Sequence, residues 1–167
     1  AAVMGYKNLF GSDISFKAIE DSRRNISWVK ELYKTEGLKA KLLVKNVLDL
    51  SKFIKVSSAE AIITEPYLGP QRGMINFASV INELEALYSG AIREFIKILK
   101  PGGRVVMIWP LFYGQRPISP DCGGLKSINM IPEELKGSKF VKMTNRGTII
   151  YGRPGQKVYR EVVVLEK

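Results

Sequence analysis

A carboxylate, a proline and an aromatic ring stand together at Glu65-Pro66-Tyr67, where a short apolar run ends. The run before them, Ala61 to Ile63, is partly β-branched and predicts a buried parallel strand. Open α/β sheets bind their ligands at the carboxyl ends of such strands. We therefore expect Glu65 and Tyr67 to hold an amino group on a flat base. The alternative is an ordinary strand-to-loop exit with one solvated glutamate.

Two further polar side chains lie at the ends of predicted strands. Leu9 to Ile14 predicts a short strand that ends around Asp13, and Lys41 to Asn46 predicts the next one. A carboxylate between a strand and a helix accepts hydrogen bonds from ribose hydroxyls in nucleotide-binding βαβ units. The amide of Asn46 could meet an adenine edge, with the backbone N–H of Val47 alongside. Ordinary turn chemistry is the alternative at both positions.

The intervening sequence predicts the elements that position these groups. Ser15 can cap a helix that Gly37 ends, with one apolar face made of Ile19, Ile26, Val29 and Tyr33. A second helical stripe runs from Phe77 to Leu99, which Ser89-Gly90 could interrupt. Residues 100–103 then turn the chain into a buried strand at 104–110. Residues 1–6 look like the last turn of a helix, residues 47–54 like a loop or short helical turn, and residues 71–73 like a mobile loop.

The last third of the chain predicts loops followed by strands. Residues 111–137 are rich in Gly, Pro and Ser and predict a loop-heavy crossover with a helix start at Ile131-Pro132-Glu133-Glu134. Strands are expected at 140–143, 148–153 and 158–166, and Pro154-Gly155-Gln156 signals a hairpin between the last two. We find no convincing domain boundary, so residues 1–167 are expected to form a single domain.

Composition excludes several classes of chemistry. The 167 residues are 46% hydrophobic and 25% charged, the profile of a soluble globular protein. No apolar run approaches the roughly 20 residues that span a bilayer, and nothing resembles a signal peptide, so we expect a cytoplasmic protein. Cys122 is the only cysteine and histidine is absent. A disulfide within the chain, a Ser-His-Asp triad, a Cys-His pair and a structural zinc site are therefore excluded, and no metal is expected.

The charge balance indicates a polyanionic partner. Lysine and arginine total 26 against 16 acidic residues, which gives a net charge of +10 and a pI near 9.7. Nucleic acid is the first expectation and an anionic membrane surface the second. Arg153, Lys157 and Arg160, in the terminal hairpin, are candidates for phosphate contacts. A merely solvated basic surface is the alternative.

Several longer segments resemble one family in the same order. GSDISFKAIEDSRRNI, AIITEPYLGP, FIKILKPGGRVV and YGRPGQKVYREVVVLEK are similar to segments of the RNA methylase family related to the tRNA guanine-N2 methyltransferases, which are class I S-adenosylmethionine-dependent enzymes. The resemblance covers nearly the whole chain. It implies a Rossmann-like α/β fold, with a mostly parallel sheet and a C-terminal antiparallel hairpin, and RNA, with tRNA first, as the partner.

The resemblance also assigns roles to residues. Asp13 with Ile14 would hold the ribose of S-adenosylmethionine, and Asn46 with Val47 would meet its adenine, Asn46 standing where the family usually has Asp. Glu65-Pro66-Tyr67 matches the start of the family's catalytic D-P-P-Y. There the acid and a neighbouring carbonyl accept hydrogen bonds from the target amine, and the aromatic ring stacks on the base. Glu65 replaces Asp, and without gaps the aromatic position falls on Leu68; we expect Tyr67 to turn inward as the stacking ring.

The family's glycine-rich D-P-F-C-G-T-G loop has no counterpart among these 167 residues. We therefore expect the first βα unit and the family's separate RNA-binding domain to be missing from this sequence, and the 167 residues alone to bind the cofactor weakly or not to act. The alternatives are a non-catalytic RNA-binding or partner-completing module and a DNA amino-methyltransferase. A dehydrogenase-like nucleotide binder is disfavoured because no G-x-G-x-x-G follows a strand.

Overall fold

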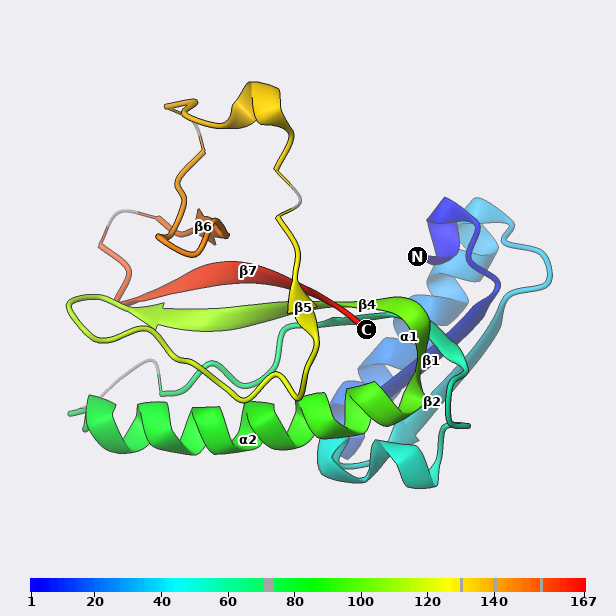
Figure 1. Cartoon of the computed structure of the whole chain (residues 1–167). Coiled ribbons are helices and arrows are strands. Elements are labelled where there is room, and N and C mark those ends of the chain that lie inside the picture. Colours follow the sequence, from blue (N-terminus) through cyan, green and yellow to red (C-terminus); the bar gives the residue numbers. More distant parts are fainter. Residues whose placement is uncertain (71–73, 130, 140, 154) are drawn as a thin grey trace. The chain divides into compact units, whose positions relative to one another are not determined.

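A computed structural model describes residues 1–70, 74–129, 131–139, 141–153 and 155–167 (Figure 1). The chain divides into two compact units, Ala1–Leu50 and Ser51–Lys167, which are described separately. The loop expected at 71–73 and the proline of the expected hairpin turn at 154 lie outside the described residues. No helix in the described ranges is long and apolar enough to cross a membrane.

The first unit is built on a parallel pair of strands. Its elements are η1 (Ala2–Met4), β1 (Asn8–Asp13), α1 (Phe16–Tyr33) and β2 (Lys39–Val44), and η2 (Val47–Lys52) follows. β1 pairs with β2 in parallel register from Asn8 opposite Lys39 to Asp13 opposite Val44. The expected helical turn at the start is confirmed as η1, which ends at Gly5 in the left-handed conformation.

Helix α1 begins where the sequence predicts and ends earlier. The Ser15 hydroxyl accepts a hydrogen bond of 3.2 Å from the Ala18 N–H, which confirms it as the N-cap. On the predicted apolar face Ile19 is buried, whereas Tyr33 is 51% exposed. The helix does not extend to Gly37, because Lys34 already takes a left-handed conformation with φ of 47°.

The second unit contains a mixed sheet. Its elements are β3 (Ala59–Thr64), α2 (Phe77–Ile98), β4 (Leu99–Phe112), β5 (Lys126–Ser127), η3 (Glu133–Leu135), β6 (Ile149–Tyr151) and β7 (Val158–Glu166). The strand order is β3-β4-β7-β5, with β6 also paired to β7. β3 and β4 are parallel, whereas β5, β6 and β4 each run antiparallel to β7. The antiparallel C-terminal pair that the sequence predicts is confirmed.

Several predicted boundaries in this unit need correction. β3 was expected to be buried, but it ends the strand order, and Ile63 is 76% exposed because only β4 pairs with it among the described residues. α2 is unbroken at Ser89, whose hydroxyl bonds to the Glu85 carbonyl within the helix. Residues 100–103 belong to β4, with an irregular register against β3 and a left-handed Gly102 in place of the expected turn. Of the strand expected at 140–143, the described part forms one bridge, between Met143 and Ile149.

The core of the second unit lies between α2 and one face of the sheet. β4 and β7 place directly paired side chains on the same face, such as Met107 beside Val163, and both are almost fully buried. α2 runs along the length of β4 in Figure 1. It buries a stripe of side chains at helical spacing: Ile81, Leu84, Tyr88, Ile92, Phe95 and Ile98. This stripe confirms the predicted apolar face.

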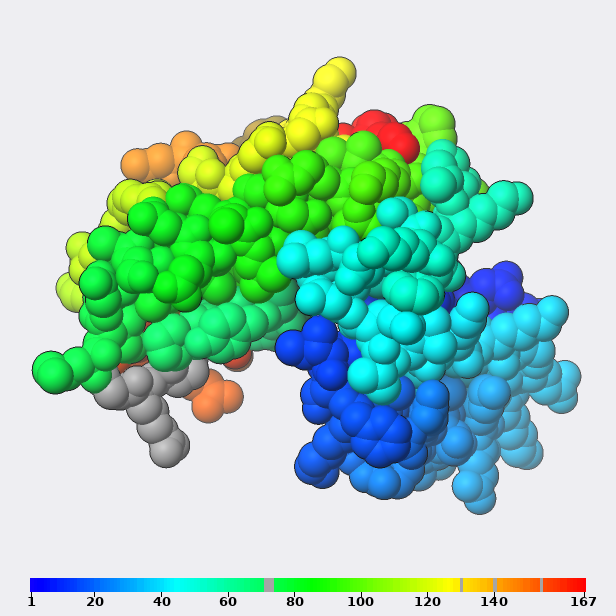
Figure 2. Space-filling view, turned by 90° about the horizontal axis from the view of Figure 1, so that it is seen from below, coloured from blue at the N-terminus to red at the C-terminus, as the bar shows by residue number. Residues whose placement is uncertain are grey.

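Two polar clusters fasten the long crossover to this core. Arg116 forms two hydrogen bonds with the Glu85 carboxylate, at 2.6 and 2.9 Å, and the Ser119 N–H donates a third at 2.7 Å. The hydrogen bond from Arg116 holds the pKa of Glu85 below its usual value. Figure 2 shows the crossover, in yellow, lying beside the green surface of α2.

The second cluster is centred on a buried carboxylate, whose cationic partner Arg146 reaches the surface. Glu161 on β7 is fully buried and accepts hydrogen bonds of 2.5 Å from Arg146 and from Thr148. Arg146 also donates to the Ile118 carbonyl at 2.9 Å and lies 5.3 Å from the centre of the Trp109 ring. A desolvated carboxylate therefore depends on one guanidinium that also ties two loop segments to the sheet.

Candidate active site

The strand exit that the sequence singles out is held by contacts from distant elements. Glu65 follows the last residue of β3, and its Oε1 atom accepts a hydrogen bond of 2.7 Å from Arg160 Nε on β7. The Glu65 side chain is half exposed. A carboxylate offers about four acceptor positions. The bond to Arg160 therefore fixes the direction of the side chain while the second oxygen can still accept a hydrogen bond from a ligand.

The backbone after Glu65 is fixed by α2. The Tyr88 hydroxyl donates a hydrogen bond of 2.8 Å to the Tyr67 carbonyl, and the Tyr88 ring is fully buried. Burial, with the negative charge of Glu65 nearby, raises the pKa of Tyr88 well above its ordinary value. The hydroxyl therefore stays protonated and remains a donor throughout the physiological pH range.

Close packing and backbone conformation explain why residue 69 is a glycine. Gly69 has φ of +88°, a conformation that side chains disfavour. A Cβ atom there would lie 3.1 Å from Val80 and 3.2 Å from Phe112. The loop therefore packs directly on α2 and on the end of β4.

The two candidate stacking side chains have opposite environments. Leu68, which falls on the family's aromatic position without gaps, is only 8% exposed and belongs to the core. The Tyr67 ring is 63% exposed, so it does not turn into the protein as expected. Its peptide carbonyl is bound from the inner side by Tyr88, and the ring remains accessible to a ligand.

The predicted nucleotide-binding residues come together within the first unit. Asp13 ends β1 directly beside Val44 of β2, and the Lys45 N–H donates to the Asp13 carbonyl at 2.9 Å. Asn46 therefore follows at the same edge of the parallel pair. Asp13 Oδ1 accepts a hydrogen bond of 2.7 Å from Ser15, next to the exposed Ile14. The predicted meeting of this edge with Glu65 stays a prediction.

Asp13 and Asn46 both make the local turn contacts of the alternative interpretation. Both can still accept a further hydrogen bond from a ligand. Asn46 Oδ1 accepts the Leu48 N–H at 3.0 Å, an Asx-type contact beside the half-buried Val47. An amide oxygen has two lone pairs, so Asn46 can accept a second hydrogen bond. Asp13 likewise keeps acceptor capacity beyond its contact with Ser15.

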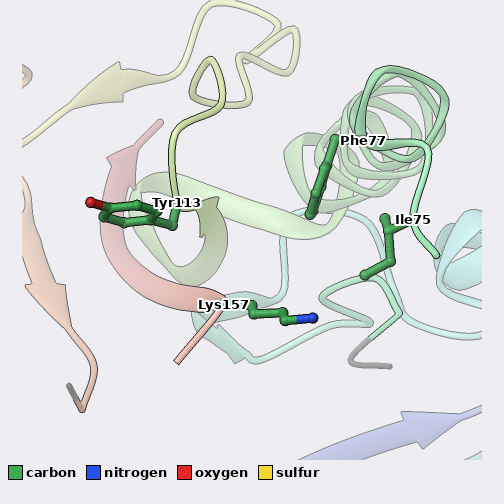
Figure 3. A pocket seen from close by; sticks show the side chains of 4 residues that line it. All are labelled: Ile75, Phe77, Tyr113 and Lys157. Carbon is green, nitrogen blue, oxygen red and sulfur yellow. The ribbon is translucent and has the colours of Figure 1, made fainter. Parts of the chain in front are cut away.

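The three basic candidates have different surroundings. Arg160 is paired with Glu65, so the structure brings a predicted phosphate contact and a predicted catalytic residue together. Arg153 has an exposed side chain, and its N–H bonds to Gln156 Oε1. Lys157 is exposed and lines a hollow of about 230 Å³ with Ile75, Phe77 and Tyr113 (Figure 3).

Sequence reasoning missed the side chains that support the site. Tyr88 was assigned to the apolar stripe of α2, although its hydroxyl gives it a polar contact in the core. Phe77 was counted in the same stripe, and Tyr113 carried no signal beyond lying in the crossover.

Among the described residues no group of three His, Cys, Asp or Glu side chains could hold a metal ion.

Solved structures resemble this chain, whereas no family model and no curated protein sequence matches it. A SAM-dependent methyltransferase from Methanosarcina mazei is similar over 99% of this chain and 84% of its own, with 20% identity and a TM-score of 0.55. An rRNA methylase from Streptococcus thermophilus matches over 96% and 74%, with 14% identity and a TM-score of 0.48. TrmN from Thermus thermophilus matches over 96% and 44%, with 18% identity and a TM-score of 0.45.

Of these three likenesses, the one to the Methanosarcina mazei protein shows the fold. The similarity to the Methanosarcina mazei protein, together with the strand topology, gives the chain the Rossmann-like α/β fold of the methyltransferases. The predicted Rossmann-like α/β class is therefore confirmed. The expected mostly parallel sheet is instead a mixed one, because among the described strands all three pairings of β7 are antiparallel.

Proposed function

We propose that this chain is the catalytic part of an S-adenosylmethionine-dependent N-methyltransferase. Its substrate is an exocyclic amine of a nucleic acid base, with guanine-N2 in tRNA as the first candidate from the sequence resemblance. The observation that carries the proposal is the anchored Glu65-Pro66-Tyr67 exit of β3. Its carboxylate is oriented by Arg160 and its backbone by Tyr88, while the Tyr67 ring stays exposed.

The chain's own residues suit the acceptor half of this reaction. The free Glu65 oxygen accepts a hydrogen bond from the amine N–H, and the neighbouring Pro66 carbonyl accepts the second. The exposed Tyr67 ring stacks on the base, which fixes the direction of the amine lone pair. After nitrogen has taken the methyl group, Glu65 or water takes the surplus proton. Orientation and exclusion of water do most of this work, since no strong base is needed.

The first unit provides acceptors that fit the cofactor. Asp13, next to Ile14, can take a ribose hydroxyl, as carboxylates at strand ends do in nucleotide-binding units. Asn46 can accept from the adenine amine, and the Val47 backbone can donate to the ring. Both side chains lie at one edge of the β1–β2 pair and keep acceptor capacity. S-Adenosylmethionine supplies the electrophilic methyl group when it is bound.

The net charge supports a nucleic acid substrate. A chain of charge +10 attracts a phosphate backbone, and Arg153 and Lys157 are exposed for such contacts. Because Arg160 is engaged by Glu65, we assign its guanidinium to positioning rather than to phosphate.

Product identification tests the proposal. Protein produced from its native gene is incubated with S-adenosylmethionine carrying a deuterated methyl group and with unmodified tRNA or DNA, and the nucleosides are analysed by mass spectrometry. Labelled N2-methylguanosine from tRNA is the expected product. Labelled N6-methyladenine or N4-methylcytosine from DNA supports the alternative function, a DNA amino-methyltransferase. RNA binding without a labelled product supports the non-catalytic module and refutes the proposal.

A further inference from the structure

A hollow of about 230 Å³ lies on the second unit, apart from the Glu65 carboxylate. Its lining comes from three segments: Ile75 before α2 with Phe77 at its first position, Tyr113 after β4, and Lys157 before β7. Figure 3 shows the Phe77 ring extending toward Lys157 and the Tyr113 ring on the other side, with its hydroxyl directed outward. The Ile75, Phe77 and Lys157 side chains therefore lie around one space, and the Tyr113 ring extends from its rim, away from the other three.

The walls of this hollow are fixed before any ligand binds. The Phe77 ring packs against Phe112 with ring centres 5.3 Å apart, and Phe112 is almost fully buried. The Tyr113 N–H bonds to the Lys157 carbonyl at 3.2 Å, which ties those two segments together. The Tyr113 side chain nevertheless remains 79% exposed. A large, exposed ring on an anchored backbone is a surface prepared for stacking.

The size and position of the hollow restrict its ligand. At about 230 Å³ it lies below the roughly 300–1,000 Å³ of pockets for drug-sized molecules, so it suits one ring system. Lys157 precedes Arg160, the partner of Glu65, by three residues, about 10 Å along an extended chain. A chemical group bound in the hollow would therefore lie next to a group bound at Glu65. The two sites would hold two different groups.

We infer that this hollow holds one nucleotide of a single-stranded nucleic acid, adjacent to the nucleotide held at Glu65. Its base stacks on the Tyr113 ring at the rim of the hollow, and its phosphate meets the Lys157 ammonium group. Such a combination of aromatic stacking and positive charge is how proteins bind single strands without reading sequence. The inference rests on the proposed function for the presence of a nucleic acid at Glu65, but the hollow can be tested without methyl transfer.

Fluorescence anisotropy of a labelled ten-nucleotide single strand, without a methyl donor, tests this inference. Tyr113→Ala should weaken binding roughly 5- to 150-fold, the range for loss of one base–aromatic stack. Lys157→Gln should lower the slope of log K against log salt by about 0.7, the value for one phosphate of a single strand. Matched controls are Tyr151→Ala on β6 and Lys126→Gln on β5, both exposed, which should leave affinity and slope unchanged. Ribo- and deoxyribo-oligonucleotides are measured separately, so that binding of RNA is distinguished from binding of DNA.

Each outcome decides the inference. Loss of affinity in Tyr113→Ala together with a reduced slope in Lys157→Gln supports it, even if no methylated product is ever found. Binding by both variants at the parent's affinity and slope overturns it. A change in only one of the two variants also overturns it. So does a labelled polyglutamate peptide whose binding the two variants weaken as much as that of the oligonucleotide, because the hollow would then be a general anion contact. Circular dichroism confirms that the variants fold.

Discussion

Arg160 Nε donates a hydrogen bond of 2.7 Å to Glu65 Oε1, joining side chains that are 95 residues apart in the sequence. Both side chains are partly exposed, so the pair adds little to stability. The pair instead orients the Glu65 side chain, because it holds one carboxylate oxygen and leaves the other able to accept a hydrogen bond. Glu65 is one methylene longer than the aspartate of the methylase family that the sequence resembles, and the bond to Arg160 limits the freedom that this length brings.

Replacing Arg160 should impair turnover more than substrate binding. In Arg160→Ala we expect kcat for methyl transfer to fall about tenfold with little change in KM, since misdirection of a reacting group costs rate. Arg160→Lys should restore only part of the rate, because an ammonium group is a point charge without the planar donors of guanidinium. Initial rates at varied RNA concentration measure both parameters.

Arg153→Ala is the matched control for this variant. Arg153 is exposed and belongs to the same terminal segment, so its loss should raise KM and leave kcat unchanged. A rise in KM without loss of kcat in Arg160→Ala would mean that Arg160 contacts phosphate, contrary to its assignment as a positioning residue.

Tyr67→Ala should reduce methyl transfer strongly without destabilising the protein. The ring is 63% exposed, so its removal leaves no cavity, whereas loss of a base–aromatic stack costs about 1–3 kcal/mol of binding. We expect kcat/KM to fall roughly 5- to 150-fold, with an unchanged urea midpoint. Tyr151→Ala, which removes an exposed ring elsewhere, should leave kcat/KM unaffected. Undiminished transfer by Tyr67→Ala would exclude this ring from the site.

Arg146→Met should strongly destabilise the second unit. It leaves the fully buried Glu161 carboxylate without its cationic partner, and breaking such a pair costs about 3–5 kcal/mol. Arg104→Met breaks the exposed pair with Glu166 and should cost less than about 1 kcal/mol. Urea titration at pH 7 gives both values. Equal, small losses in the two variants would show that Glu161 does not depend on Arg146.

The pair of Glu85 with Arg116 predicts a pH-dependent stability. Because the pKa of Glu85 is lowered in the folded protein, its contribution is present above the unfolded value near 4.5 and is lost as pH falls through the folded pKa. Glu85→Gln should therefore cost about 1 kcal/mol at pH 7, and the difference from the parent should shrink below about pH 4.5. Unfolding at a series of pH values measures it. A difference that is constant down to pH 3 would contradict the assignment.

Local chemistry made part of the fold predictable. The strand at 158–166 has the predicted bounds, because a β-branched run follows clear turn residues. The Ser15 cap and the position of Asp13 at a strand end were predicted for the same reason, since a cap depends on neighbouring residues alone. Leu68 and Tyr67 could not be separated by sequence, because their burial depends on packing against α2.

Long-range contacts account for what the sequence did not show. Neither Arg160 nor Tyr88 carries a local sign that it supports the Glu65 loop, because both contacts form only when β7 and α2 reach that loop. β3 was expected to be buried because its residues are apolar. Its exposure depends on the number of neighbouring strands, which apolar residues alone do not determine.

The rate of methyl transfer by Glu65→Gln tests the central claim most directly. Glutamine keeps the shape of the side chain but has a single acceptor oxygen, so it cannot accept from both Arg160 and the target amine. Because the amine is then misdirected, we expect kcat to fall about a hundredfold while the affinity for S-adenosylmethionine stays unchanged. Glu60→Gln, an exposed carboxylate on the same strand, should transfer methyl groups at the parent's rate. Transfer by Glu65→Gln as fast as by the parent would contradict a catalytic role for this carboxylate and, with it, the proposed site.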